Sequence, residues 1–231
     1  AQVGNQQYRT RNYSYITYYQ AMKFRESYSF PAQVSVSVYA TGMGTLKYGS
    51  EKTNPNVSVR GVDENYLATA GYEVEKGRDF SDGEITGADP VALIGKRVET
   101  MLFKGGESPL DKVISIGSGK YRVIGVLKSK SSGFGGGGDL ICFIPYTNAR
   151  VYFSRPNMNF DIQVKPSATE LVEAAVSEAE AQFRTVRGLT PLDETDFNIE
   201  KSDNIVKLLL DNIRNITLVA TIIGIITLLG A

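Results

Sequence analysis

The chain has 231 residues, of which 42% are hydrophobic and 22% charged, so most of it is expected to fold. Its 25 Lys and Arg residues balance 25 Asp and Glu residues, which predicts no basic surface for nucleic acid. Histidine is absent, and this excludes Ser-His and Cys-His catalysis and His-metal ligation. The single cysteine, Cys142, cannot form an intramolecular disulfide.

The N-terminal part predicts a helix followed by two strands. Residues 14–26 have apolar side chains at helical spacing, namely Ile16, Tyr19 and Met22. Residues 33–40 alternate valines with polar residues, which predicts a strand with one buried face. A turn is expected at Gly42–Gly44, and a second alternating strand follows around residues 57–62.

Residues 63–156 are interrupted by glycines and contain short apolar segments, so they are expected to form mainly strands. The segment 112–126 predicts a hairpin with a tight turn at Gly117–Lys120. Residues 129–140 are too rich in glycine for regular structure and predict an exposed, mobile loop around Phe134, Gly135 and Gly136. This loop is interpreted as a flexible tip, with contact to a partner protein as the alternative.

Regular patterns return after residue 157. A strand is expected at 159–164, and Ser167 with Glu170 is consistent with a helix capping box. The helix is expected to end at Gly188. Its apolar stripe consists of Leu171, Val172, Ala175, Val176, Ala179 and Phe183. Another short strand is predicted at 196–200.

These patterns predict an α+β fold with a discontinuous organisation. Residues 1–62 and 157–201 would form one α/β subdomain from both ends of the chain. Residues 63–156 would form a strand-rich subdomain inserted between them. Residues 202–231 would form a stalk helix that enters a truncated transmembrane helix.

The residues provide no support for an enzyme or a cofactor site. The segment Gly117–Tyr121 lacks the first glycine and the final Ser or Thr of a phosphate-binding loop, and it lies in a predicted hairpin. The carboxylates of Asp79, Asp82 and Glu84 do not have the spacing of a calcium loop and are interpreted mainly as helix caps or solvent-facing groups. We therefore predict no catalytic residue, no cofactor-binding residue and no metal ligand.

The end of the chain predicts one continuous helix. Its first part is amphipathic, with Ile205, Leu209, Ile213 and Ile216 at helical spacing. After Arg214 no charged residue follows, which leaves about 17 residues, or about 25 Å of helix. A hydrocarbon core is about 30 Å thick. A truncated transmembrane helix is therefore favoured over a core or interface helix.

Four short motifs, in this order and spacing, resemble the periplasmic core domain of MacB-type (FtsX-like) ABC transporter permeases. They are Gly61–Tyr66, Gly77–Phe80, Leu102–Gly105 and Val123–Val126. The resemblance extends from about Val57 to the end of the chain, and residues 216–231 are similar to the start of the family's second transmembrane helix. One departure is Asp111, where the family has glycine; Asp tolerates a positive φ better than most residues.

The resemblance implies the extracytoplasmic domain of an export or efflux permease in the cell inner membrane, on the periplasmic side. It implies a homodimer or paired permease and ATP hydrolysis on a separate ATP-binding domain or subunit. It further implies lipid contact through the C-terminal helix, and a periplasmic adaptor with an outer-membrane channel as further partners. The stalk would transmit ATP-driven motion. A membrane-anchored extracytoplasmic binding module without transport activity is the alternative, and a soluble hydrolase is a more distant one.

Overall fold

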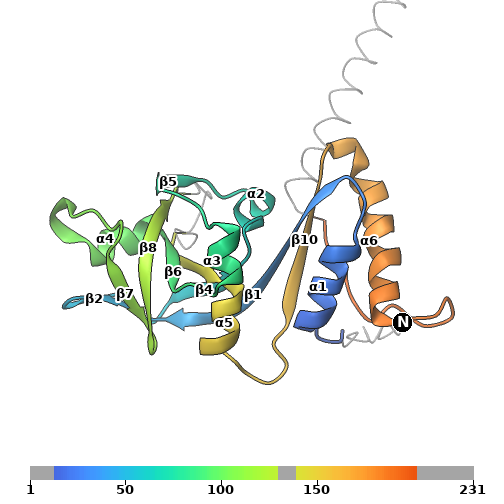
Figure 1. Cartoon of the computed structure of the whole chain (residues 1–231), viewed down its shortest axis with the longest axis horizontal. Coiled ribbons are helices and arrows are strands. Elements are labelled where there is room, and N and C mark those ends of the chain that lie inside the picture. Colours follow the sequence, from blue (N-terminus) through green and yellow to red (C-terminus); the bar gives the residue numbers. More distant parts are fainter. Residues whose placement is uncertain (1–12, 130–138, 202–231) are drawn as a thin grey trace, which may run out of the picture.

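A computed structural model describes residues 13–129 and 139–201. This part of the chain is a mixed α+β domain built on one ten-stranded sheet (Figure 1). The strands are β1 (Ala32–Gly44), β2 (Leu46–Tyr48), β3 (Glu51–Lys52), β4 (Val57–Val62), β5 (Val74–Gly77), β6 (Val91–Gly95), β7 (Val113–Ile116), β8 (Gly119–Leu127), β9 (Ile141–Pro145) and β10 (Phe160–Pro166). The helices are α1 (Tyr18–Ser27), α2 (Tyr66–Ala70), α3 (Asp82–Thr86), α4 (Lys96–Leu102), α5 (Tyr146–Tyr152) and α6 (Val172–Arg187).

The sheet curls back on itself at one end. Its strand order is β10-β1-β4-β9-β6-β8-β7-β2-β3, and β5 pairs with β8 beside this path. Only Thr45 separates β1 from β2 in the chain. The order of neighbouring strands that starts at β1 and β4 ends at β2 and β3, so the sheet returns to the end of β1. The larger apolar core lies within this curled part, whereas α1 and α6 pack together beside β1 and β10 (Figure 1).

Strand β1 connects the two parts of the molecule, because its two halves have different partners. Residues Ala32–Val38 pair with β10, and residues Val38–Gly44 pair with β4 on the opposite edge. The turn predicted at Gly42–Gly44 is therefore wrong, since β1 continues to Gly44 through two irregularities in its pairing with β4. A Cβ on Gly44 would lie 2.8 Å from the Val57 carbonyl oxygen, so glycine lets the two strands approach here.

The expectation of one buried face on β1 is also wrong. Ser35 and Ser37 are as fully buried as the valines Val36 and Val38 between them. The reason is that α1 covers one face of the β1–β10 pair while α2 also contacts β1 and β10. Alternation in sequence reports side-chain polarity, and it cannot report that a second element covers the polar face.

The helix α1 differs from its prediction in its start and its buried face. It begins at Tyr18, after a capping box formed by Thr17 and Gln20. Ala21 and Phe24 are its buried residues, whereas Tyr19, predicted to be on the apolar face, is 72% exposed. The helix packs on both β1 and α6, so its core-facing stripe is set by two neighbours.

The C-terminal elements partly follow the sequence. The helix α6 buries four residues of the predicted stripe, Val172, Ala175, Ala179 and Phe183, and it is capped by Gly188 with φ +71°. The other two, Leu171 and Val176, are only half-buried, and Leu171 lies in the turn before the helix. The predicted capping box at Ser167 and Glu170 is wrong, because a 3-10 turn at Thr169–Leu171 precedes α6 and no side chain caps it. Residues 196–200 are not a strand; Phe197 is buried against Phe183 with ring centroids 4.7 Å apart.

None of the helices within residues 13–129 and 139–201 is long and apolar enough to cross a membrane. The predicted stalk and transmembrane helix, residues 202–231, lie outside the described residues.

Candidate functional site

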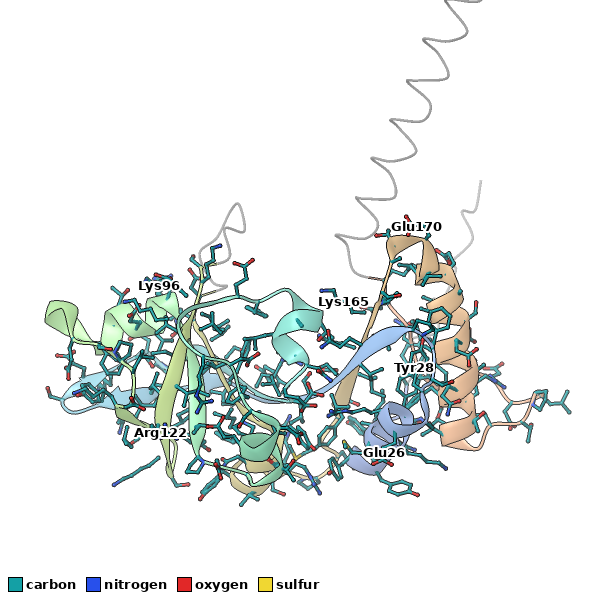
Figure 2. All side chains as sticks on the ribbon, turned by 45° about the horizontal axis from the view of Figure 1, so that its top comes forward. Glu26, Tyr28, Lys96, Arg122, Lys165 and Glu170 are labelled. Carbon is teal, nitrogen blue, oxygen red and sulfur yellow. The ribbon has the colours of Figure 1, made fainter. Side chains whose placement is uncertain are left out.

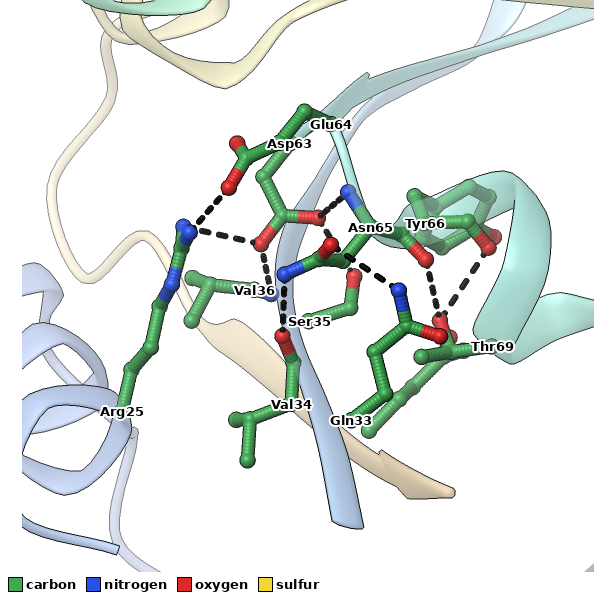
Figure 3. A network of polar contacts seen from close by, with 11 residues as sticks. Arg25, Gln33, Val34, Ser35, Val36, Asp63, Glu64, Asn65, Tyr66 and Thr69 are labelled. Atoms are coloured by element: carbon green, nitrogen blue, oxygen red, sulfur yellow. Dashed lines mark hydrogen bonds and ion pairs between the residues drawn. The ribbon is translucent and has the colours of Figure 1, made fainter. Parts of the chain in front are cut away.

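The candidate site is a buried polar cluster where β4 ends against the middle of β1. Beyond Val62 the chain leaves the sheet, and the Tyr66 N–H donates to the Asp63 carbonyl as α2 begins. The side chains of Arg25, Gln33, Ser35, Asp63 and Asn65 converge here, and we refer to them as the Asp63 junction (Figure 3).

The Asp63 junction extends the hydrogen-bond ladder of β1 with side chains in place of a strand. Val38 pairs with Gly61, so the same register places Asp63 opposite Val36 and Asn65 opposite Val34. At these positions the Val36 N–H donates to Asp63 Oδ2 at 2.7 Å, and Asn65 Nδ2 donates to the Val34 carbonyl at 3.0 Å (Figure 3). Buried backbone groups need partners, and these two side chains provide them where β4 has turned away.

The Asp63 carboxylate is fully buried and accepts four hydrogen bonds. The donors are Ser35 Oγ at 2.7 Å, the Val36 N–H at 2.7 Å, Arg25 Nη1 at 3.1 Å and the Asn65 N–H at 3.2 Å. Burial raises the pKa of Asp63 above its usual value, while the bonds from Ser35 and Val36 and the charge of Arg25 oppose that rise. The carboxylate has no acceptor position left for a substrate or a metal ion.

Arg25 links this junction to the helical layer. Burial lowers the pKa of its guanidinium, but the charges of Glu64 and Asp63 outweigh burial and raise it. Arg25 pairs with both carboxylates from α1 (Figure 3). One residue beyond α1, the Tyr28 hydroxyl donates to the Ala175 carbonyl of α6 at 3.0 Å, and Figure 2 shows this ring beside α6.

Apolar contacts reinforce the link between α1 and α6. The shared cluster consists of Phe24, Tyr28, Val34, Ala179, Phe183 and Phe197. Within it, the rings of Phe24 and Phe183 meet edge to face at 5.9 Å, a favourable arrangement for aromatic pairs. Contacts therefore run without a break from α6 through α1 and the Asp63 junction into β1 and β4.

A second polar cluster joins three strands beside the Asp63 junction. Arg60 on β4 donates to Ser37 Oγ on β1 at 3.1 Å and to Asp161 Oδ2 on β10 at 2.6 Å. On the neighbouring helix α2, Thr69 Oγ1 lies 3.1 Å from Gln163 Oε1 of β10. The Arg60–Asp161 bond connects β10 to β4 although the two strands are not neighbours in the sheet, and the Thr69–Gln163 contact connects β10 to α2.

Two of the three carboxylates singled out in the sequence have hydrogen-bond partners in the structure, whereas the third, Asp82, is exposed. Glu84 forms a two-bonded ion pair with Arg78 and a capping box with Ser81 at the start of α3. The bond from Arg78 is the main cause that lowers the pKa of Glu84 to about 2, with burial opposing it. Asp79 accepts from the Phe80 N–H at 2.7 Å. The interpretation of these residues as caps is thus confirmed for Glu84.

The thiol of the single cysteine is inaccessible in the folded structure. Cys142 is fully buried, and burial raises the pKa of its thiol well above the usual range. Within residues 13–129 and 139–201, no group of three or more Asp, Glu or Cys side chains could hold a metal ion. The polar contacts described above join α1, β1, β4, β10 and α6 to one another.

Three of the sequence motifs mark places of close packing. A Cβ on Gly61 would lie 2.6 Å from Ala149 Cβ, so glycine lets α5 pack on β4. Gly77, with φ +79°, is paired with Gly125 across β5 and β8, and a Cβ there would lie 2.2 Å from the Ile124 carbonyl oxygen. Asp111 has φ +63°, which confirms that this turn needs a positive φ.

The residues predicted to carry the function are not among those the structure brings together. Ile205, Leu209, Ile213 and Ile216 of the predicted stalk lie outside the described residues, as do Phe134, Gly135 and Gly136 of the glycine-rich loop. Sequence reasoning missed Arg25 and Asp63. An acidic residue directly after a buried strand, followed by Asn at the start of a helix, was the available signal.

Comparison with known proteins identifies relatives of most of the chain. The family model described as MacB-like periplasmic core domain matches residues 1–182. A protein of Yersinia pestis named macrolide export ATP-binding/permease protein MacB 2 is 31% identical over 186 residues, which cover 80% of this chain and 26% of the relative. The protein of the same type from Chlorobaculum tepidum is 35% identical over 167 residues, covering 71% and 25%. The chain thus spans about a quarter of the length of these relatives.

Solved structures share the fold. The periplasmic region of MacB from Actinobacillus actinomycetemcomitans superimposes with a TM-score of 0.67 at 21% identity, covering 87% of this chain and 86% of that one. The extracellular domain of the ABC-type transporter YknZ from Gram-positive bacteria gives a TM-score of 0.61 at 22% identity, covering 76% and 86%. At these identities the similarity concerns the fold.

Proposed function

The chain belongs to the family of MacB-like periplasmic core domains, and from this premise we propose that it is the extracytoplasmic domain of an ABC transporter permease subunit. The relatives are named as macrolide export ATP-binding/permease proteins, and about a quarter of their length corresponds to this chain. ATP is then bound and hydrolysed by a separate domain or subunit. The protein resides in the cell inner membrane with this domain on the periplasmic side.

In this proposal the domain transmits ATP-driven motion to the export or efflux of a substrate. Residues 202–231 form the stalk helix and the start of a transmembrane helix, with Ile205, Leu209, Ile213 and Ile216 along the stalk. Residues 1–62 and 157–201 form the porter-like subdomain next to the stalk, and residues 63–156 form the inserted subdomain. Motion of the stalk first reaches Lys201, which pairs with Glu173 of α6 at 2.5 Å.

The observation that carries the proposal is the unbroken polar and apolar connection from α6 to β4. A domain that transmits motion has to move as a rigid unit, because free movement of its elements relative to one another would reduce the displacement passed on. The Asp63 junction provides this stiffness: it fixes α1, β1 and the β4–α2 segment through one buried carboxylate. Removing one partner from such a buried network costs several kcal/mol, on the order of 3–5.

The remaining partners belong to the same proposal. The permease works as a homodimer or as a pair of permease subunits, together with the ATP-binding domain or subunit. The apolar end of the chain contacts membrane lipid. A periplasmic adaptor and an outer-membrane channel complete the export route. The loop around Phe134, Gly135 and Gly136 stays a flexible tip in this proposal, with contact to such a partner as the alternative.

The test uses cysteine crosslinking in the full-length transporter. Cysteines at Leu209 or Ile213 are expected to form symmetric crosslinks whose yield changes between the ATP-bound and nucleotide-free states. The natural Cys142 can stay in place because it is buried. A cysteine at Leu192, which is 96% exposed on the loop after α6, serves as a reactive control outside the stalk.

Crosslinking yields at Leu209 and Ile213 that are the same in the ATP-bound and nucleotide-free states would refute transmission through the stalk. They would fit a membrane-anchored binding module without transport activity. A second measurement is macrolide export by the Asp63→Asn variant. We expect ATP hydrolysis to persist while export falls, because the ATP-binding part is separate and only the connection in the extracytoplasmic domain is weakened.

A further inference from the structure

One edge of β1 lacks a partner strand over part of its length. On the edge opposite β4, β10 pairs with β1 up to Val38, and within the described ranges no strand pairs with that edge between Tyr39 and Gly44. Immediately after this interval, β2 pairs with β7 from Leu46 to Lys47. We use the name β1 gap for residues Thr41–Thr45, which comprise the end of β1 and the one residue that separates it from β2. An unpaired strand edge presents N–H and C=O groups to another chain.

The first part of the free edge is closed by Arg155. Its guanidinium donates to the carbonyls of Tyr39 and Ala40 at 2.6 and 2.8 Å. Within the β1 gap, the Met43 N–H donates to the hydroxyl of Thr41 two residues earlier, a weak local bond of 3.1 Å. The Met43 side chain is 76% exposed. At the β1 gap, an incoming backbone can therefore replace the local bond between Met43 and Thr41 with a main-chain hydrogen bond between strands.

A cavity of about 370 Å³ lies alongside the β1 gap. Beyond the gap residues, it is lined by Lys47 of β2, by Ser115 and Ile116 of β7 with the adjoining Gly117, and by Phe153 after α5. Five residues of strand span about 17 Å, and a paired strand lies about 4.8 Å away. A strand added at this edge would therefore lie beside the cavity, where Ile116 and Phe153 offer apolar contacts.

The charges around the cavity are positive. Lys47 lines it, and Lys120 follows on the same sheet face, because Lys47 pairs with Ser115 and Ser115 pairs with Lys120. Neither lysine has an ion-pair partner among residues 13–129 and 139–201, and no lining residue is acidic. A second copy of this chain would bring its own Lys47 to the same place, and like charges across an interface are unfavourable.

We propose that the β1 gap is a docking site for an extended, acidic peptide segment of a partner protein, which adds to the sheet as a strand beside Thr41–Thr45. Main-chain hydrogen bonds to the free edge give affinity in this mode of recognition, and alternate side chains give selectivity. Lys47 and Lys120 select acidic side chains. This inference does not depend on the transport function, since it rests on the free edge, the cavity and the charges.

The experiment measures binding of a designed peptide to the full chain in detergent. The probe is a fluorescent six-residue peptide of alternating Glu and Val with blocked ends. Two control peptides replace Glu by Lys, or the central Val by Pro, which removes a main-chain donor. We expect fluorescence anisotropy to show the Glu peptide binding at least about tenfold tighter than either control, because only it combines the right charge with all backbone donors.

Two protein variants test the position of the site. Lys47→Glu should weaken binding of the Glu peptide by about fivefold or more, because it reverses a charge next to the bound strand. Lys23→Glu, the same change on the exposed face of α1, should leave binding unchanged. Hydrogen–deuterium exchange should show slower exchange of the amides of residues 41–45 when the Glu peptide is bound.

The proposal is overturned if the three peptides bind equally, if none binds, or if both lysine variants have the same effect. It is also overturned if the amides of residues 41–45 exchange at the same rate with and without the peptide. A concentration-dependent dimer that Lys47→Glu abolishes would show that a second copy occupies the site instead. Loss of peptide binding would leave the nucleotide-dependent crosslinks at Leu209 unaffected, so the two proposals can fail separately.

Discussion

The substitution Asp63→Asn tests whether one buried carboxylate holds the helical layer to the sheet. The carboxylate accepts four hydrogen bonds, two of them from backbone N–H groups of Val36 and Asn65. An amide offers one oxygen in place of two and adds an N–H₂ group. Whichever way the introduced amide turns, at least one of these buried donors faces another donor.

The expected loss follows from the contacts. Breaking a buried, hydrogen-bonded charge network by changing one partner costs about 3–5 kcal/mol. Burial of the Asp63 charge is itself unfavourable, as the raised pKa of this carboxyl shows, and the neutral amide avoids that cost. We therefore expect the free energy of unfolding to fall by about 2–3 kcal/mol, and Tm to fall by about 5–12 °C.

The assay is urea unfolding followed by circular dichroism, with Asp161→Asn as the matched control. Asp161 also pairs with an arginine, but its side chain is 45% exposed, so its substitution should cost less than about 1 kcal/mol. The difference in stability between the wild type and Asp63→Asn should widen as the pH falls through the raised pKa of Asp63, because protonation relieves the cost of burying the charge in the wild type, whereas the amide does not titrate. Equal losses for the two variants would refute the reasoning.

Three further predictions concern stability and reactivity. Arg78 lowers the pKa of Glu84 to about 2, so the ion pair stabilises the fold above pH 4.5 and this stabilisation is lost as the pH falls toward 2. Glu84→Gln should lower the free energy of unfolding by about 1–2 kcal/mol at pH 7 and should reduce the loss of stability in acid. An unchanged dependence on acid pH would contradict this prediction. Gly61→Ala should lower the free energy of unfolding by about 2–3 kcal/mol, measured by thermal unfolding, because the added Cβ has no room. Gly83→Ala, in open space within α3, should be neutral or slightly stabilising, and similar Tm values for the two variants would count against the packing argument. Cys142 should react with a thiol reagent only as fast as the protein unfolds, and rapid labelling of the folded chain would show that its burial is wrong.

Local pattern alone correctly predicts several elements. The alternating valines of β1 and β4, the apolar stripe of α6 and the hairpin at Gly117 are all present. These features depend on periodicity and turn chemistry, which involve residues close together in the chain. The positive φ at Asp111 agrees with the resemblance, in which the family has glycine at this position.

The failures occur where residues far apart in the chain meet. Local spacing predicts an apolar helix face for Tyr19 and a strand for Ile199, but the packing of α1 and α6 leaves these side chains 72% and 37% exposed. The turn expected at Gly42–Gly44 is strand because β4 supplies a partner for β1 there. In each case a contact between distant segments decides the outcome.

The sequence by itself determined the α+β class, the helices α1 and α6, the strands β1, β4, β7, β8 and β10, and the resemblance to a family, because these depend on composition, periodicity and short motifs. Only the tertiary structure decided that β1 has two partners on opposite edges and that Asp63 and Asn65 complete its ladder as β4 ends. It alone placed Arg25 against Asp63, 38 residues away, and left Thr41–Thr45 without a strand on one side. Burial and pairing depend on which surfaces the fold brings together, and a linear pattern does not contain that information.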